Sequence, residues 1–171
     1  MSTTTHAHNT HALVHYQNAL DQLRHGLTPS ALAIESAASC LTSLLMRDAV
    51  VVLMTGVALP SPDRIDKEGL PAALVADSMA TILDRDRGRR PDSTVALHVD
   101  LLTRIVTHLS PTECAPAHTL LALVAWWSGE TGTASHHVKE ALTVDPEYRL
   151  AHLVAYAIAC AIQPGWVTTN H

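Results

Sequence analysis

Apolar residues recur at three- and four-residue steps along most of this chain, the spacing that places them on one face of a helix. The first such face carries Leu13, Tyr16, Leu20, Leu23 and Leu27. Before residue 110 the pattern predicts four helices, over about 10–25, 28–54, 70–84 and 93–109. Thr28-Pro29 and Asp92 are residue types that begin helices.

The β-branched run 49–54 is the weakest part of this assignment, because it also fits one short buried strand. No other segment alternates convincingly between apolar and polar residues, so a lone strand would lack a partner. We therefore expect helix there, and a loop over 59–69, which contains two prolines and several charges.

The C-terminal half predicts a helix hairpin followed by a packing helix. An almost wholly apolar stretch over 116–128 is interrupted at Gly129 to Gly132, and an amphipathic stretch follows over 133–143. Asp145-Pro146 then has the residue types of a cap and a first helical position, which predicts a third helix over 147–162.

Within this half, Ala115 to Pro146 has the spacing of one tetratricopeptide (TPR) unit of about 34 residues. Ala134 and Ala141 would let the two helices approach closely, and Val138 would fill the space between them. The prediction is a TPR-like antiparallel hairpin with a packing helix, together 115–162. Seven helices then form a compact, all-α single domain over 10–171, preceded by a flexible polar arm over 1–9.

A closer resemblance lies in Ala125-Trp126, Gly129 and Gly132, Asp145-Pro146, Tyr148 and Leu150-Ala151. In this order, these elements resemble the C-terminal part of the actinobacterial family called domain of unknown function 4192. Arg47-Asp48 before an apolar run also fits the middle section of that family. Since its members are commonly longer, the chain resembles a C-terminal half standing alone, and the family implies no activity.

Composition excludes several classes of protein. The chain has 171 residues, of which 47% are hydrophobic and 16% charged, so it is not expected to be disordered. A formal charge of −5 argues against nucleic-acid binding, and the arginines between 85 and 90 alternate with aspartates as in a solvated loop. The N-terminus lacks a signal peptide, and the apolar runs are too short for a membrane. We expect a cytoplasmic protein with its three cysteines reduced and buried.

Histidine is abundant, with 12 residues, and four of them (His6, His8, His11 and His15) lie near the N-terminus. His11 and His15 would share a helix face one turn apart, a spacing that can hold a transition metal. No Cys, Asp or Glu nearby completes a site, so they are weak candidates. No nucleophile motif or phosphate-binding glycine loop is present, and we expect no enzyme, no cofactor and no small-molecule ligand.

The adjacent tryptophans Trp126 and Trp127 point about a hundred degrees apart on a helix. Both could be core residues beneath the terminal helix. Alternatively, Thr119, Leu123 and Trp126 would line the concave face of the hairpin and bind a partner, with Trp166 as a lid or a further contact.

The leading hypothesis is a non-enzymatic module that binds another protein or itself through a helical surface. A metal- or small-ligand-binding regulatory domain, with the His-rich N-terminus as sensor, is the alternative from another class. A small mobile-element protein that inhibits a host factor is also compatible with the half-length form.

Overall fold

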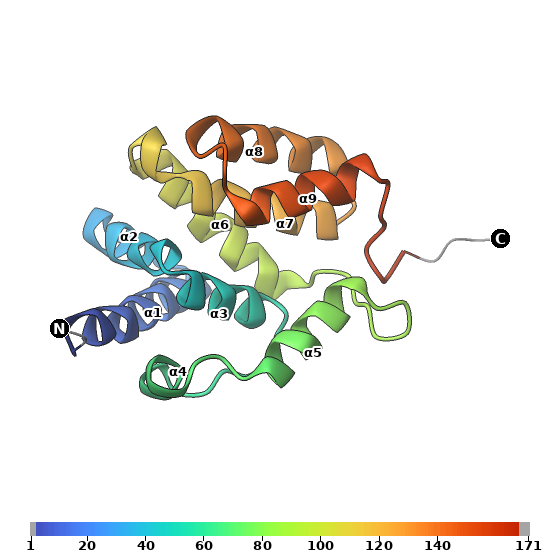
Figure 1. The fold of residues 1–171 in the computed structure, drawn as a ribbon. Coiled ribbons are helices and arrows are strands. Elements are labelled where there is room, and N and C mark those ends of the chain that lie inside the picture. Colours follow the sequence, from blue (N-terminus) through green and yellow to red (C-terminus); the bar gives the residue numbers. More distant parts are fainter. Residues whose placement is uncertain (1–2, 168–171) are drawn as a thin grey trace. The chain divides into compact units, whose positions relative to one another are not determined.

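The computed structural model describes the backbone of residues 3–167 and the side chains of residues 11–167. Within this part of the chain it has nine α-helices, two 3-10 turns and no strand (Figure 1). The predicted all-α class is therefore confirmed, while the count of seven helices is wrong. The contacts gather into two compact units, Met1–Ser78 and Met79–His171, where the sequence suggested one helical domain.

The first unit contains four helices, a 3-10 turn and the start of a fifth helix. They are α1 (Thr3–Arg24), α2 (Ala31–Ala38), the turn η1 (Ser39–Thr42), α3 (Leu44–Met54), α4 (Pro62–Glu68) and the first part of α5 (Ala72–Leu83). Helix α1 begins at Thr3 rather than near Thr10; Met1 and Ser2 of the expected arm lie outside the described residues. Helix α4 forms inside the expected loop over 59–69, with Pro62 at its first turn.

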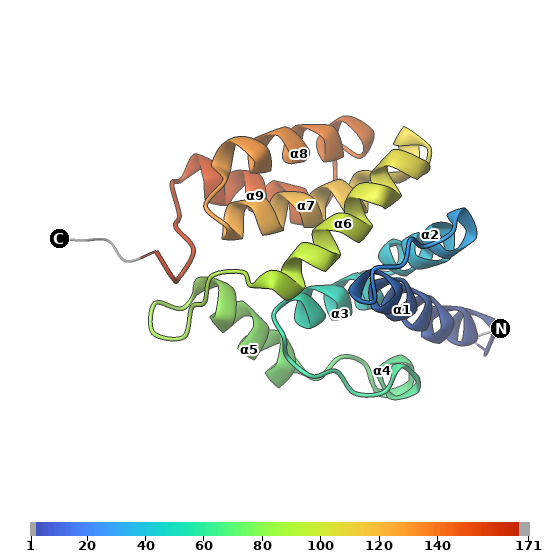
Figure 2. The same cartoon turned by 180° about the vertical axis from the view of Figure 1, so that it is seen from behind.

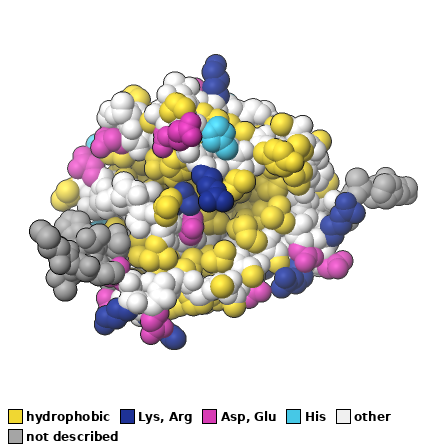
Figure 3. Space-filling view, viewed as in Figure 1, with side chains coloured by type: hydrophobic (Ala, Val, Ile, Leu, Met, Phe, Trp, Pro, Cys, Tyr) yellow, Lys and Arg dark blue, Asp and Glu magenta, His cyan; other side chains and the backbone are white. Residues whose placement is uncertain are grey.

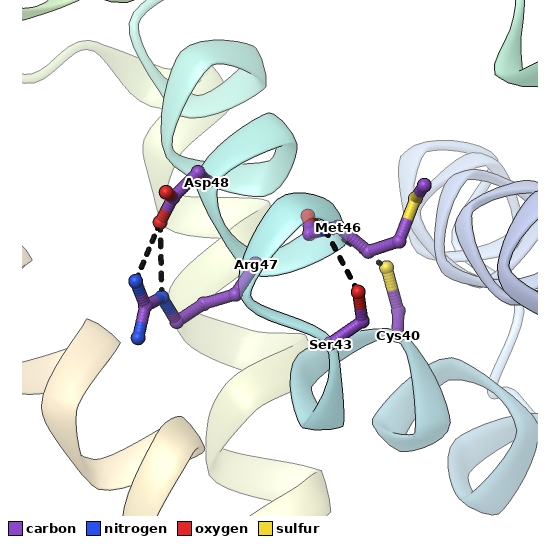
Figure 4. A network of polar contacts seen from close by, with 5 residues as sticks. All are labelled: Cys40, Ser43, Met46, Arg47 and Asp48. Carbon is purple, nitrogen blue, oxygen red and sulfur yellow. Dashed lines mark hydrogen bonds and ion pairs between the residues drawn. The ribbon is translucent and has the colours of Figure 1, made fainter. Parts of the chain in front are cut away.

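The predicted helix over 28–54 is divided into α2, η1 and α3. Its expected cap, Thr28-Pro29, is replaced by Ser30, whose hydroxyl accepts a hydrogen bond from the Ala33 amide at 3.3 Å. A second cap, Ser43, accepts from the Met46 amide at 3.5 Å and starts α3 (Figure 4). Because α3 includes 49–54, the strand alternative is excluded.

Figure 4 also shows how the start of α3 is connected to its surroundings. The Cys40 thiol contacts the Met46 carbonyl at 4.0 Å, and both side chains are buried. On the other side of the helix, Arg47 Nη2 lies 2.6 Å from the Asp48 carboxylate, which is half exposed. The pair that resembled the family's middle section is thus an ion pair between neighbouring residues of α3.

No single helix among residues 3–167 is both long and apolar enough to cross a membrane. Ala31–Thr42 and Leu44–Met54 pass a test of length and composition only as a pair, and they are bent by 106°. The extended backbone of Ser43 (φ −91°, ψ 127°) lies at this bend.

The core of the first unit agrees with the predicted stripe over most of α1. Leu13, Tyr16 and Leu20 are buried, and Leu23 is half-buried. Leu27, in contrast, is 60% exposed, because α1 has already ended and Gly26 turns the backbone at a φ of +72°. The apolar spacing predicted for α1 therefore extends to Leu27, although the helix itself ends before this residue.

The second unit contains four complete helices and one 3-10 turn after the end of α5. They are α6 (Ser93–His108), the turn η2 (Pro111–Glu113), α7 (Ala115–Trp127), α8 (Thr131–Val144) and α9 (Arg149–Ala159). The predicted cap Asp92 is confirmed, since its carboxylate accepts from the Thr94 amide at 2.8 Å. Ser110 makes no side-chain cap and instead contacts the Thr112 hydroxyl at 3.0 Å.

Helices α7 and α8 form a hairpin, and α9 packs against both (Figures 1 and 2). Gly129 makes the turn at a φ of +86°, a backbone conformation that glycine adopts without strain. Ala134 and Ala141 are fully buried and Val138 is 8% exposed. The predicted close approach of the two helices at small residues is therefore found.

The cysteines differ in exposure, which corrects the expectation that all three are buried. Cys40 and Cys114 are buried, but Cys160 is exposed after the end of α9. Burial raises the pKa of the Cys40 thiol from 9.0 to about 12, and it also raises the pKa of Cys114. Since the thiolate is the reactive form, we expect Cys160 alone of the three to react rapidly with a thiol reagent in the native chain at concentrations low enough to keep it monomeric. Ellman titration before and after denaturation measures this, and rapid native labelling of Cys40 would contradict it.

Candidate protein-binding surface

Two adjacent tryptophans end α7, and both are buried at 3% exposure. The Trp126 indole N–H donates to the Ile162 carbonyl at 3.1 Å, and the Trp127 indole N–H donates to the Arg89 carbonyl at 2.8 Å. Each indole thus fills space with its ring and satisfies its N–H with a backbone oxygen distant in sequence. Trp126 and Trp127 are therefore both core residues, as one of the two interpretations of the sequence predicted.

Trp166 completes this arrangement, and we call Trp126, Trp127 and Trp166 the tryptophan clasp. The Trp166 indole N–H donates to the Trp127 carbonyl at 2.7 Å. The Arg90 guanidinium lies 5.1 Å from the centre of the Trp166 ring, within the range of a cation–π contact. Trp166, which the sequence suggested as a lid or a further contact, is thus half-buried and holds the segment after α9 against the end of α7.

Two glycines allow the backbone to pass close to this clasp. The Gly165 amide donates to the Ile82 carbonyl at 2.8 Å, and the Gly88 amide donates to the Asp84 carbonyl at 2.7 Å. A Cβ on Gly165 would lie 2.1 Å from the Asp84 oxygen, and one on Gly88 would lie 2.4 Å from the same atom. These distances are shorter than any side chain tolerates, so both positions require glycine.

The predicted partner-binding residues therefore do not form a free surface. Thr119 is fully buried and its hydroxyl donates to the Ala115 carbonyl at 2.8 Å, within its own helix. Leu123 is half-buried, and Trp126 is covered by the segment that follows α9. The prediction of a concave face lined by these side chains is wrong, because α7 is the central helix of the unit and α6, α8 and α9 pack against it.

The histidine candidates His11 and His15 lie one turn apart on α1. His11 and His15 are both exposed on α1, while the side chains of His6 and His8 lie outside the described ones. Across the described side chains, no three His, Cys, Asp or Glu residues are placed to hold a metal ion.

A different histidine pair does come together in the hairpin. His118 on α7 and His137 on α8 approach to 3.1 Å between their Nδ1 atoms. Burial lowers the pKa of both rings, as do nearby positive charges, while the Glu140 carboxylate raises both. No sequence pattern indicates this pair, since its members lie 19 residues apart on different helices.

Two large apolar side chains that the structure leaves exposed in this unit lie on α9. Arg149, Leu153, Tyr156 and Cys160 follow one another at steps of four, three and four residues, so the first three lie on one face of α9 and Cys160 follows them at its C-cap. All four are exposed, with Leu153 at 56% and Tyr156 at 63%. We call them the α9 stripe. In Figure 3, the side on which α9 lies toward the viewer in Figure 1 shows hydrophobic side chains among charged and histidine side chains.

Sequence reasoning missed this stripe because Leu153 and Tyr156 share the exposed face of α9 with the polar residues Arg149 and His152. Ala151 and Val154 are the buried residues of the helix and point toward the hairpin that α9 covers. One sequence signal could have indicated the stripe. Leu153, Tyr156 and Cys160 recur at three- and four-residue steps, separately from Ala151 and Val154, which are three residues apart.

The comparisons agree with the resemblance noted in the sequence. No curated protein and no solved structure matches the chain. A family model described as a domain of unknown function, DUF4192, matches residues 3–165. This match spans both compact units, and the chain therefore belongs to the DUF4192 family.

Proposed function

We propose that this chain is a non-enzymatic assembly module that pairs with a second copy of itself through the α9 stripe. The observation that carries the proposal is the exposure of Leu153 and Tyr156, 56% and 63%, side by side on one face of the last helix. Large apolar side chains exposed as a group mark interaction sites more often than single ones do. Tyrosine is also enriched among the residues that dominate binding energy.

The spacing of the stripe fits another helix as its partner. Leu153 and Cys160 are seven residues apart, which is roughly 10 Å along a helix axis. A stripe of this length, repeating at three and four residues, packs along a second helix with the same repeat. The α9 stripe is itself such a helix face, and twofold pairing of identical surfaces is the commonest form of assembly.

The charges of the stripe favour an antiparallel pair. Leu153, Tyr156 and Cys160 are uncharged, so two copies meet in the centre without repulsion between like charges. Arg149, at the N-terminal end, would lie beside the C-terminal end of the partner's α9. A cation is favourable there because the free carbonyl groups give the end of a helix a partial negative charge.

The hairpin supports the same function by its shape. The close packing of α7 and α8 at Ala134, Val138 and Ala141 is that of a TPR-like unit, and α9 then occupies the place of the next helix. In such architectures each helix pair buries its apolar face against the following pair. A second copy would supply that cover for the α9 stripe.

We expect Tyr156→Glu to convert a dimer into a monomer, because it places a charge at the centre of an apolar contact. Sedimentation equilibrium or light scattering after gel filtration measures the mass in solution. The matched control is Leu32→Glu on α2, where an equally apolar side chain is 72% exposed in the other unit. The control should remain dimeric. A wild-type chain that is monomeric at high micromolar concentration, or a Tyr156→Glu variant that stays dimeric, would overturn the proposal.

A further inference from the structure

The facing histidines of the hairpin form an unusual contact between two titratable rings. Their Nδ1 atoms are 3.1 Å apart, and the ring centres are 5.3 Å apart with a tilt of 37°. A nitrogen–nitrogen hydrogen bond needs one N–H donor and one lone pair. Since a protonated imidazole has no lone pair, this contact between α7 and α8 requires at least one neutral ring.

The groups around the pair oppose a second positive charge more than they support it. The ring of His136 lies 5.3 Å from that of His137, and its charge opposes protonation of both members of the pair. Glu140 is the carboxylate whose charge favours protonation of both rings. Each ring is also half-buried, which disfavours its charged form.

The other elements packed against α7 and α8 are α6, η2 and α9. Their titratable side chains are His98, Asp100, Arg104 and His108 on α6, Glu113 on η2, and Arg149, His152 and Tyr156 on α9. Asp100 and Arg104 form an ion pair with each other at 2.8 Å, and His152 Nε2 contacts the Pro146 carbonyl at 2.6 Å. The charges that act on the pair are those of His136 and Glu140, both on α8.

We propose that His118 and His137 form a proton-sensitive latch that holds α8 against α7 at neutral pH and releases it on acidification. When both rings are charged, the Nδ1 contact is lost and two cations remain close together with one nearby carboxylate. The repulsion acts at the packed surface between the helices, so it opens the hairpin locally.

The direction of the pH effect follows from the linkage between protonation and folding. Burial lowers the pKa of both histidines below their ordinary value of 6.5 in the closed hairpin. The open hairpin, with more ordinary pKa values, binds more protons at mildly acidic pH. The stability of the closed form is therefore complete above about pH 7 and declines as the pH falls through 6.5 toward the lowered pKa values.

The test is hydrogen exchange of the α8 amides at pH 7.5 and pH 5.0, corrected for the intrinsic pH dependence of exchange. We expect the opening constant of α8 in the wild-type chain to rise several-fold at pH 5.0. His118→Gln and His137→Gln each keep a polar side chain but remove one titration, so the rise should be much smaller in both. His11→Gln, an exposed position in the other unit, should behave like wild type.

An equal rise in wild type and in both glutamine variants would overturn the latch, as would no rise in wild type. Repeating the measurement in the Tyr156→Glu variant separates the latch from the proposed dimer. The pH dependence of α8 should persist there, because the latch lies between two helices of the same chain.

Discussion

Replacement of Gly165 by alanine is expected to lower the free energy of unfolding by about 3 kcal/mol, a large effect for one methyl group. The added Cβ would lie 2.1 Å from the Asp84 carbonyl oxygen and 2.8 Å from the Leu83 carbonyl carbon. These neighbours are backbone atoms, so no side-chain rotation relieves the contact. The segment would have to move, which breaks the hydrogen bond from the Gly165 amide to Ile82 and displaces Trp166.

Gly132→Ala is the matched control, because a Cβ at this position in α8 meets no atom within 4 Å. Alanine should there raise the free energy of unfolding by about 0.5 kcal/mol, since glycine loses more backbone entropy when a helix forms. Urea denaturation followed by tryptophan fluorescence measures both variants. Equal stabilities of Gly165→Ala and wild type would show that the chain does not pass close to Asp84 as described.

Truncation of Trp127 to alanine is expected to cost about 3–5 kcal/mol, the range for removing a large buried aromatic. The side chain is 3% exposed, and its N–H satisfies the Arg89 carbonyl at 2.8 Å. The truncation removes the ring and leaves that carbonyl without its donor. Circular dichroism at increasing urea concentration gives the change in unfolding free energy.

Trp127→Phe divides this effect into packing and hydrogen bonding. Phenylalanine keeps an aromatic ring but lacks the N–H, so we expect a smaller loss of about 1–2 kcal/mol. Leu32→Ala, at a side chain that is 72% exposed, should change the stability by less than about 0.5 kcal/mol. A loss in Trp127→Ala no greater than in Leu32→Ala would mean that the tryptophan clasp does not stabilise the fold.

The helical class was predictable because local signals carry it. The apolar stripe of α1 and the small residues of α8 at Ala134 and Ala141 are visible without any tertiary contact. The cap at Asp92 was found in the same way, since a cap acts on amides only two residues away. The helix boundaries were ambiguous where an apolar pattern and a capping residue indicated different ends. Ser43 divides the expected helix over 28–54, although the apolar pattern continues across it.

The candidate site was less predictable, because exposure is a property of the packed unit. Trp126 and Tyr156 are both large aromatic residues on apolar helices, yet Trp126 is 3% exposed and Tyr156 is 63% exposed. From the sequence, Trp126 was either a core residue or a partner contact, and α9 had only a packing role. Which of them faces solvent depends on the order in which the helices cover one another.

The sequence by itself determined that this chain is all-helical, that α7 and α8 form a hairpin packed at small residues, and that it resembles DUF4192. Each of these rests on residues close together in the chain. The tertiary structure alone decided how the tryptophan clasp forms, since its indole groups donate to carbonyls 36, 38 and 39 residues away. It also decided that the α9 stripe is exposed and that His118 meets His137. Contacts of this range are set by how helices pack, and helical periodicity gives only the face of a helix that is apolar, without naming its partner.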